Sequence, residues 1–187
     1  MTCRGRTLTL AITCLFLANV PSFGQTSSLA LSSGSVGLGG TISLNLNLTV
    51  PSGAVAPAGL QWTLSFSAGD VASISVTAGT ALTNAGKSVQ CNPSSGSLTC
   101  LAFGVNATTI SSGVAAQVSI TLPASTSSSS VPVSVLNAVA AFADGSGSSI
   151  PATGGAITVV GWQAPNPPHR SAGCRRHRPR REVRPSL

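Results

Sequence analysis

Two cysteines, Cys91 and Cys100, give the clearest sign of chemistry in this sequence of 187 residues. They bracket a turn-rich stretch, residues 92–99, that separates two strand-like runs. Across a β-hairpin two such cysteines can face each other at bridging distance, and an exported chain meets an oxidising environment. The spacing therefore predicts a disulfide. A metal site or a nucleophilic cysteine would need further ligands or a histidine base, and both histidines lie after residue 160.

Catalytic groups are scarce in the central part of the chain. Between Gln25 and Val160 the only charged residues are Asp70, Lys87 and Asp144. A glycosidase needs two carboxylates that flank one bond, but each aspartate stands next to a glycine in a turn context. A serine triad needs a histidine, which this region lacks. We therefore expect no enzyme activity, no cofactor and no metal, and we interpret both aspartates as structural.

Residues 1–24 follow the order of a secretory signal peptide. Two arginines precede an apolar run at 8–20, and small residues then stand where signal peptidase needs them for a cut between Gly24 and Gln25. The alternative is an uncleaved membrane anchor, but about a dozen apolar residues are short for a bilayer that needs about 20. The sequence predicts a secreted or cell-surface protein whose mature chain has no transmembrane segment.

The formal charge of +7 is concentrated at the two ends of the chain. The region 25–160 holds one lysine and two aspartates, so its own net charge is −1. Such a body cannot neutralise a phosphate backbone, and this argues against nucleic acid as a partner.

The composition changes abruptly at residues 161–187, which are rich in arginine and proline. Proline breaks helix and strand and like charges repel, so we expect a disordered tail that folding does not need. One interpretation is electrostatic attachment to an anionic envelope or polymer. The other is that GC-rich DNA was read out of frame. Cys174 is the odd thiol of the mature chain and could form an intermolecular bridge.

A period of two dominates the region between these ends and predicts β-strands. In Thr41–Val50, apolar side chains alternate with Ser, Thr and Asn, which gives one buried face and one polar face. Leu60–Phe66 repeats the pattern and places Trp62 on the core side rather than on a sugar-stacking surface. The other strands are expected at 29–31, 71–77, 88–91, 98–103, 116–122, 131–139 and 156–160.

Turn residues punctuate these strands roughly every eight to twelve positions, and no segment has a convincing helical period. The serine run at 125–130 and the Gly/Ser stretch at 145–149 are interpreted as loops. This spacing is typical of a single antiparallel β-sandwich or jelly roll, here of about nine strands. A membrane barrel would need aromatic girdles, which the sequence lacks. We expect a monomer with the folded domain at 25–160.

The run Gly59–Phe66, followed by Val71–Gly79, resembles the early strands of cohesin domains, where an apolar alternating strand leads through a short turn into a second strand and a glycine. Residues 113–120 look like the cohesin strand that opens the second half of the domain. Residues 137–145 and 154–160 are similar to the closing hairpin. The resemblance spans nearly all of the predicted mature body and rests on pattern and order.

This resemblance implies a nine-stranded jelly-roll sandwich related to carbohydrate-binding modules. The best-known cohesins are scaffold receptors for dockerins in polysaccharide-degrading complexes. Two features depart from that pattern: the predicted disulfide is not general among cohesins, and no dockerin or second cohesin accompanies this domain. The resemblance therefore implies the fold more directly than the dockerin-binding role.

The expected function is a non-catalytic extracellular binding or scaffolding module for a dockerin-like protein partner, linked to polysaccharide degradation. Protein recognition can use broad polar strand faces such as that of Thr41, Ser43, Asn45, Asn47 and Thr49. Direct binding of polysaccharide is the alternative, but it usually relies on exposed aromatics, and the chain has no Tyr. A passive surface domain without a ligand also fits the neutral, Ser/Thr-rich composition.

Overall fold

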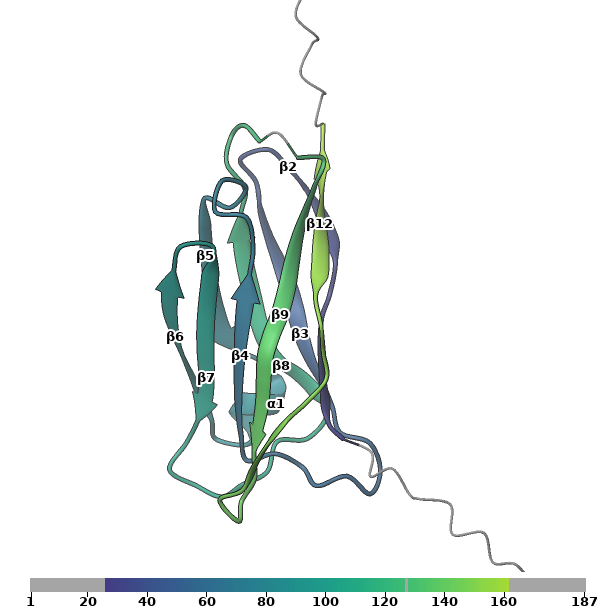
Figure 1. The fold of residues 1–187 in the computed structure, drawn as a ribbon, viewed down its shortest axis with the longest axis vertical. Helices are drawn as coiled ribbons and strands as arrows, with labels where there is room; N and C mark the ends of the chain where they lie inside the picture. The colour runs from purple at the N-terminus through teal and green to yellow at the C-terminus, as the bar shows by residue number, and fades with distance from the viewer. Residues whose placement is uncertain (1–25, 127, 162–187) are drawn as a thin grey trace, which may run out of the picture.

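Alternating apolar residues build two β-sheets that pack face to face as a sandwich (Figure 1). This computed structural model describes residues 26–126 and 128–161. The predicted signal peptide, the Gly24–Gln25 cleavage site and the tail after residue 161 lie outside the described residues. The strands are β1 (Ser28–Leu31), β2 (Gly34–Gly37), β3 (Thr41–Thr49), β4 (Gly59–Ser65), β5 (Ser73–Ala78), β6 (Ser88–Ser94), β7 (Ser97–Phe103), β8 (Gly113–Thr121), β9 (Ser130–Ala141), β10 (Gly147–Ser149), β11 (Ala152–Thr153) and β12 (Gly155–Val160).

The two sheets differ in size and share the terminal segments of the domain. The five-stranded sheet has the order β11-β1-β3-β8-β5, and the seven-stranded sheet has the order β2-β12-β9-β4-β7-β6, with β10 paired to β9. The N-terminal segment changes sheets between β1 and β2, and the C-terminal segment does so between β11 and β12. The pairs β1–β11 and β2–β12 are parallel, whereas all other described pairs are antiparallel.

The core lies between the sheets and is formed by the apolar residues of each alternating strand. Leu44, Leu46 and Leu48 of β3 are buried, while Thr41 and Ser43 of the same strand are exposed. In β4, Trp62 is 0% exposed and is flanked by two buried leucines. The predicted inward orientation of Trp62 is therefore confirmed. Burial of one face fixes the register, because a slip of one residue would expose the whole apolar set.

The predicted all-β sandwich is confirmed, and each of the nine expected strands is present. The structure adds three short strands, β2, β10 and β11, and one helix, α1 (Thr80–Asn84), that the sequence did not predict. The helix has five residues, which is too short for a helical period to appear. It is held by packing, since Ala81 and Leu82 are buried. No helix among the described residues is long and apolar enough to cross a bilayer.

Candidate docking surface

The outer face of β6, β7, β4 and β9 is the candidate docking face. Strand register arranges its side chains in four rows, and the face changes from apolar to polar along the strands. The rows are Ser88, Phe103, Gly59 and Ala141; Gln90, Leu101, Gln61 and Val139; Asn92, Thr99, Thr63 and Leu136; and Ser94, Ser97, Ser65 and Ser134.

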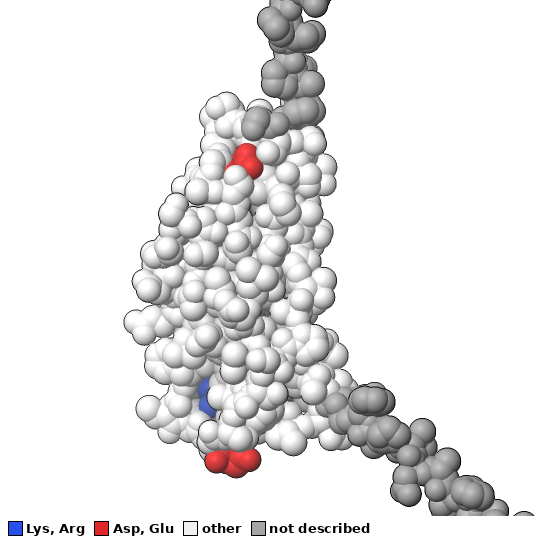
Figure 2. Space-filling view, in the orientation of Figure 1, with Lys and Arg blue, Asp and Glu red and all other residues white. Residues whose placement is uncertain are grey.

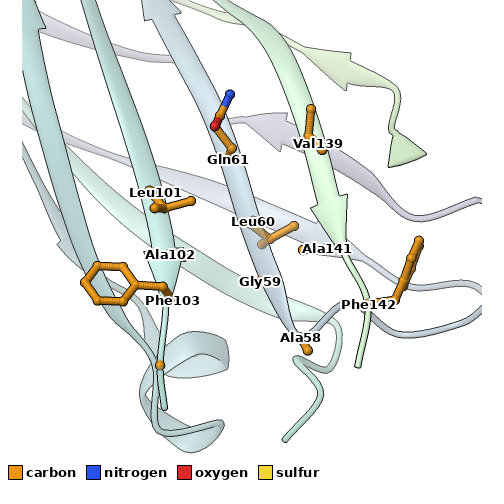
Figure 3. A pocket seen from close by; sticks show the side chains of 11 residues that line it. Ala58, Gly59, Leu60, Gln61, Leu101, Ala102, Phe103, Val139, Ala141 and Phe142 are labelled. Atoms are coloured by element: carbon orange, nitrogen blue, oxygen red, sulfur yellow. The ribbon is translucent and has the colours of Figure 1, made fainter. Parts of the chain in front are cut away.

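A hollow of ≈ 330 Å³ lies at the apolar end of the docking face (Figure 3). Its floor is low because Gly59 has no side chain and Ala141 has a small one. Phe103 and Phe142 stand on opposite sides of it in Figure 3. The remaining lining residues are Ala58, Leu60, Gln61, Leu101, Ala102, Gly104 and Val139. A hollow with these walls can receive an apolar side chain from a partner.

Three large apolar side chains are exposed on this same face. Leu101 is 47% exposed, Phe103 is 44% exposed and Leu136 is 48% exposed. Single exposed apolar residues are ordinary, but a group of them beside a hollow marks a surface that gains free energy when a partner covers it. Thr63 and Thr99 lie among them, and their hydroxyls form a hydrogen bond of 3.0 Å.

A β-bulge in β9 shapes the centre of the docking face. The pairing of β4 with β9 shifts register between Gln61 and Thr63, opposite Asn137. Asn137 has a φ of 50°, a left-handed conformation that asparagine tolerates better than most residues. The extra residue turns both Leu136 and Asn137 outward, while Val135 and Ala138 on either side remain buried.

Comparison with known proteins supports the fold. No protein-family model and no curated protein sequence matches this chain. Among solved structures, a type I cohesin from Clostridium thermocellum in complex with a dockerin matches with a TM-score of 0.63 and 14% identity, over 73% of this chain and 100% of that one. The domain has the cohesin fold.

Two further cohesins support the same assignment. One is from Clostridium acetobutylicum, with a TM-score of 0.60, 20% identity and coverage of 73% of this chain and 92% of that one. The other is a non-cellulosomal cohesin from Archaeoglobus fulgidus, with a TM-score of 0.58, 12% identity and the same 73% and 92% coverage. At these identities the likeness concerns the fold, so the function must be argued from the surface of this cohesin-like domain.

The opposite face of the cohesin-like domain is mainly polar. The outer side chains of β3 named as candidates from the sequence, Thr41, Ser43, Asn45, Asn47 and Thr49, lie on the five-stranded sheet. Serine, threonine and glutamine of β8 and β5 continue this face, and the hydroxyls of Thr41 and Thr121 form a hydrogen bond of 2.8 Å. These candidates are exposed or half-buried. The structure does not bring them together with the hollow or the exposed apolar group.

The period-two pattern of the sequence did not predict the docking face, because the apolar residues of this face stand at the positions that alternate with the core residues. In β7, Leu98, Cys100 and Ala102 are buried, whereas Leu101 and Phe103 occupy the alternate, outward positions. A strand with apolar residues at both its inward and its outward positions indicates that both faces are covered, either within the fold or by a partner. That departure from strict alternation was the available signal.

The two described carboxylates lie at opposite ends of the long axis (Figure 2). Asp70 accepts hydrogen bonds from the hydroxyls of Thr126 and Ser128, and these lower the pKa of its carboxyl. Asp144 accepts hydrogen bonds from the hydroxyl (2.6 Å) and backbone N–H (2.9 Å) of Ser146, which likewise lower its pKa. Both carboxylates stabilise loops, and their placement does not let them flank one bond. No group of three metal-ligating side chains occurs among the described residues.

Cys91 and Cys100 are joined in the structure by a disulfide with an S–S distance of 2.07 Å. They are direct partners in the pairing of β6 with β7. Cys100 is buried and is in turn the register partner of Trp62 in β4. The disulfide thus lies under the docking face and ties the edge strand β6 to the interior of the sheet.

A buried lysine holds the loop that borders the hollow. Lys87 is 4% exposed, and its Nζ donates 2.8 Å hydrogen bonds to the backbone oxygen and to Oδ1 of Asn106. Asn106 Nδ2 donates to the backbone oxygen of Gly86 at 3.3 Å, and the backbone N–H of Thr108 donates to Asn106 Oδ1 at 3.1 Å. A buried ammonium is tolerated only when acceptors surround it, so Asn106 fixes this loop beside Gly104 and the hollow.

Asn106→Ala is expected to lower the free energy of unfolding by about 2 to 3 kcal/mol, because it removes one of two acceptors from a buried charge. Urea unfolding of the domain at residues 25–160 measures it, with the exposed Asn92→Ala as the matched control. In a Lys87→Met background the same Asn106 substitution should cost less, because no charge is left without its acceptor. Equal costs in the two backgrounds would contradict this account.

Proposed function

We propose that this domain is a non-catalytic docking module that binds a folded, dockerin-like protein partner through the docking face. The observation that carries the proposal is a hollow lined by the exposed Leu101 and Phe103 on the outside of one sheet, with the exposed Leu136 further along the same face. The cohesin fold supports it, because the similar cohesin from Clostridium thermocellum was solved in complex with a dockerin. Export of the chain and a role in polysaccharide degradation belong to the same proposal.

The composition of the docking face suggests how such a partner is held. One apolar side chain of the partner fills the hollow, and Leu101 and Phe103 are covered at its rim. Truncation of such central anchors usually costs more than truncation of the surrounding contacts. The amide and hydroxyl side chains of Gln61, Thr63 and Thr99 offer hydrogen bonds that fix the orientation. Together they form an apolar centre with a polar surround, which is typical of specific protein interfaces.

The docking face has no charged side chain, so we expect its partner to bind through uncharged side chains. Among the described residues the charged side chains are Asp70 and Asp144 in end loops and the buried Lys87. Electrostatic steering is therefore weak, and the affinity should change little between low and physiological salt. A partner that binds through charged side chains would not be matched by this surface.

Direct binding of polysaccharide has less support from the surface. Phe103 is the only large aromatic side chain exposed among the described residues, because Trp62 is buried and Phe66 and Phe142 are half-buried. One exposed ring does not make a flat stacking strip for a sugar chain.

The test begins with capture of a partner from the organism's own secreted fraction on the immobilised mature chain. The captured protein is then purified, and its affinity is measured by calorimetry. Leu101→Asp/Phe103→Asp is expected to weaken binding at least thirtyfold, the size of an interface hot spot of about 2 kcal/mol. Ser43→Asp/Asn45→Asp adds the same charge to the polar face and should leave the affinity unchanged. Both variants should keep the wild-type circular dichroism spectrum.

A sedimentation assay with insoluble polysaccharides runs in parallel. Retention of the wild type on polysaccharide, with no protein captured, would overturn the proposal in favour of a carbohydrate-binding module. Equal weakening of the partner by both double variants would show that the docking face is not the interface.

A further inference from the structure

Most edge strands of the two sheets carry features that prevent pairing with another chain. Among the described residues, β2, β10 and β11 have only four, three and two residues. The edge strand β6 contains Pro93, and the disulfide joins it to β7. Short length and proline are common means by which natural sheets avoid edge-to-edge association.

The remaining edge strand, β5, has none of these features. It consists of six residues, Ser-Ile-Ser-Val-Thr-Ala, without charge, proline or glycine. It pairs with β8 in one unbroken register from Ser73 to Ala78, and no strand of the described residues lies on its other side. A straight edge strand of this length presents a row of free backbone N–H and C=O groups to a further strand.

The sandwich is also open along this edge. Ile74 and Val76 of β5 point toward the interior but are only half-buried, whereas their register partners on β8, Ile120 and Val118, are fully buried. On the facing edge of the other sheet, Val89 of β6 is likewise half-buried. Apolar side chains at this edge therefore lack cover on the same side as the free backbone groups.

We infer that this edge is a self-association surface, at which β5 of a second copy pairs antiparallel with β5 of the first. A two-fold axis through the strand pair would place like faces together. Ile74 and Val76 of each copy would cover those of the other. The outer residues Ser73, Ser75 and Thr77 would pair as hydroxyls, as Thr41 already does with Thr121 at 2.8 Å and Thr63 with Thr99 at 3.0 Å.

Charge and geometry favour a second copy as the occupant. The strand is neutral, and the nearest described charges are Asp70, whose carboxylate accepts hydrogen bonds from Thr126 and Ser128, and Lys87, which is buried. Antiparallel pairing would set the two Asp70 loops at opposite ends of the joined strands, so no like charges would meet. The β5 edge lies on the five-stranded sheet and leaves the docking face free, so this inference goes beyond the proposed function. It departs from the monomer expected from the sequence.

The test is sedimentation equilibrium of the mature chain from about 1 µM to 1 mM, a range that detects dissociation constants of weak dimers. Cys174→Ser is used throughout to remove any bridge between tails. Val76→Lys places a charge at the inward side of the edge, where its long stem can reach solvent. It is expected to raise the dimer dissociation constant at least tenfold. Ser43→Lys, an identical charge on the polar face away from the edge, should leave that constant unchanged.

Amide hydrogen exchange provides a second readout that does not depend on any variant. In the wild type, protection of amides in residues 73–78 should rise with protein concentration, while the amides of β7 remain unchanged. A chain that stays monomeric at about 1 mM, or a dimer whose protection appears elsewhere, would overturn the inference. If the wild type forms no dimer and Val76→Lys abolishes binding of a different protein, the inference is overturned and the β5 edge is the binding site of that protein instead.

Discussion

Gly155→Ala is expected to lower the free energy of unfolding by about 3 kcal/mol or more, with a fall of about 10 °C in the melting temperature. A Cβ at this position would lie 2.3 Å from the backbone oxygen of Ser32 and 3.0 Å from that of Leu31. These atoms belong to the segment in which the chain passes from β1 to β2. Because the obstacle is backbone, no side-chain rotation can relieve the clash.

The cost is large because both terminal segments change sheets at this point. Ser33 Oγ accepts a 3.0 Å hydrogen bond from the backbone N–H of Ala156, so the two crossings are held against each other. Gly37→Ala is the matched control, because a Cβ added at Gly37 would lie 3.9 Å from the nearest atom, the backbone oxygen of Val160. Urea unfolding of both variants measures the difference. If Gly155→Ala and Gly37→Ala had similar free energies of unfolding, the two crossing segments could move apart without loss of stability, which would contradict this prediction.

The long strands could be predicted because burial on one side leaves a period of two in the sequence. In β3 and β4 every buried residue is apolar and nearly every outward one is Ser, Thr, Asn or Gln. Strands β2, β10 and β11 left no such signal, since two to four residues are too few to show a period. They form because neighbouring strands offer backbone partners. Helix α1 depends in the same way on its contacts.

The candidate site was harder to predict than the fold. The disulfide could be predicted from cysteine spacing, because a hairpin is a local structure. The hollow depends on Gly59 and Ala141, which are far apart in the sequence and become neighbours only when β4 pairs with β9. The bulge at Asn137 has the same origin. Signal cleavage, export and the nature of the tail remain predictions.

Removal of the disulfide by Cys91→Ala/Cys100→Ala is expected to lower the free energy of unfolding by about 3 kcal/mol. The two cysteines are nine positions apart, and closing a loop of that length lowers the conformational entropy of the unfolded chain by roughly this free energy. The same bond also holds β6, an edge strand that pairs with β7 alone among the described strands. Without it the edge strand should fray, which hydrogen exchange of the amides in residues 88–94 would detect as lost protection.

The same variant should weaken binding of the captured partner several-fold, because β6 contributes Gln90 and Asn92 to the docking face. This effect differs from that of the Leu101 and Phe103 substitutions, since no docking side chain is changed. Ser43→Ala/Ser119→Ala, a register pair on the polar face of the five-stranded sheet, is the matched control and should preserve both stability and affinity. Chemical reduction of the wild type should reproduce the loss, with a change in fluorescence from Trp62, the register neighbour of Cys100. If reduction leaves stability and affinity intact, the disulfide does not support the face above it.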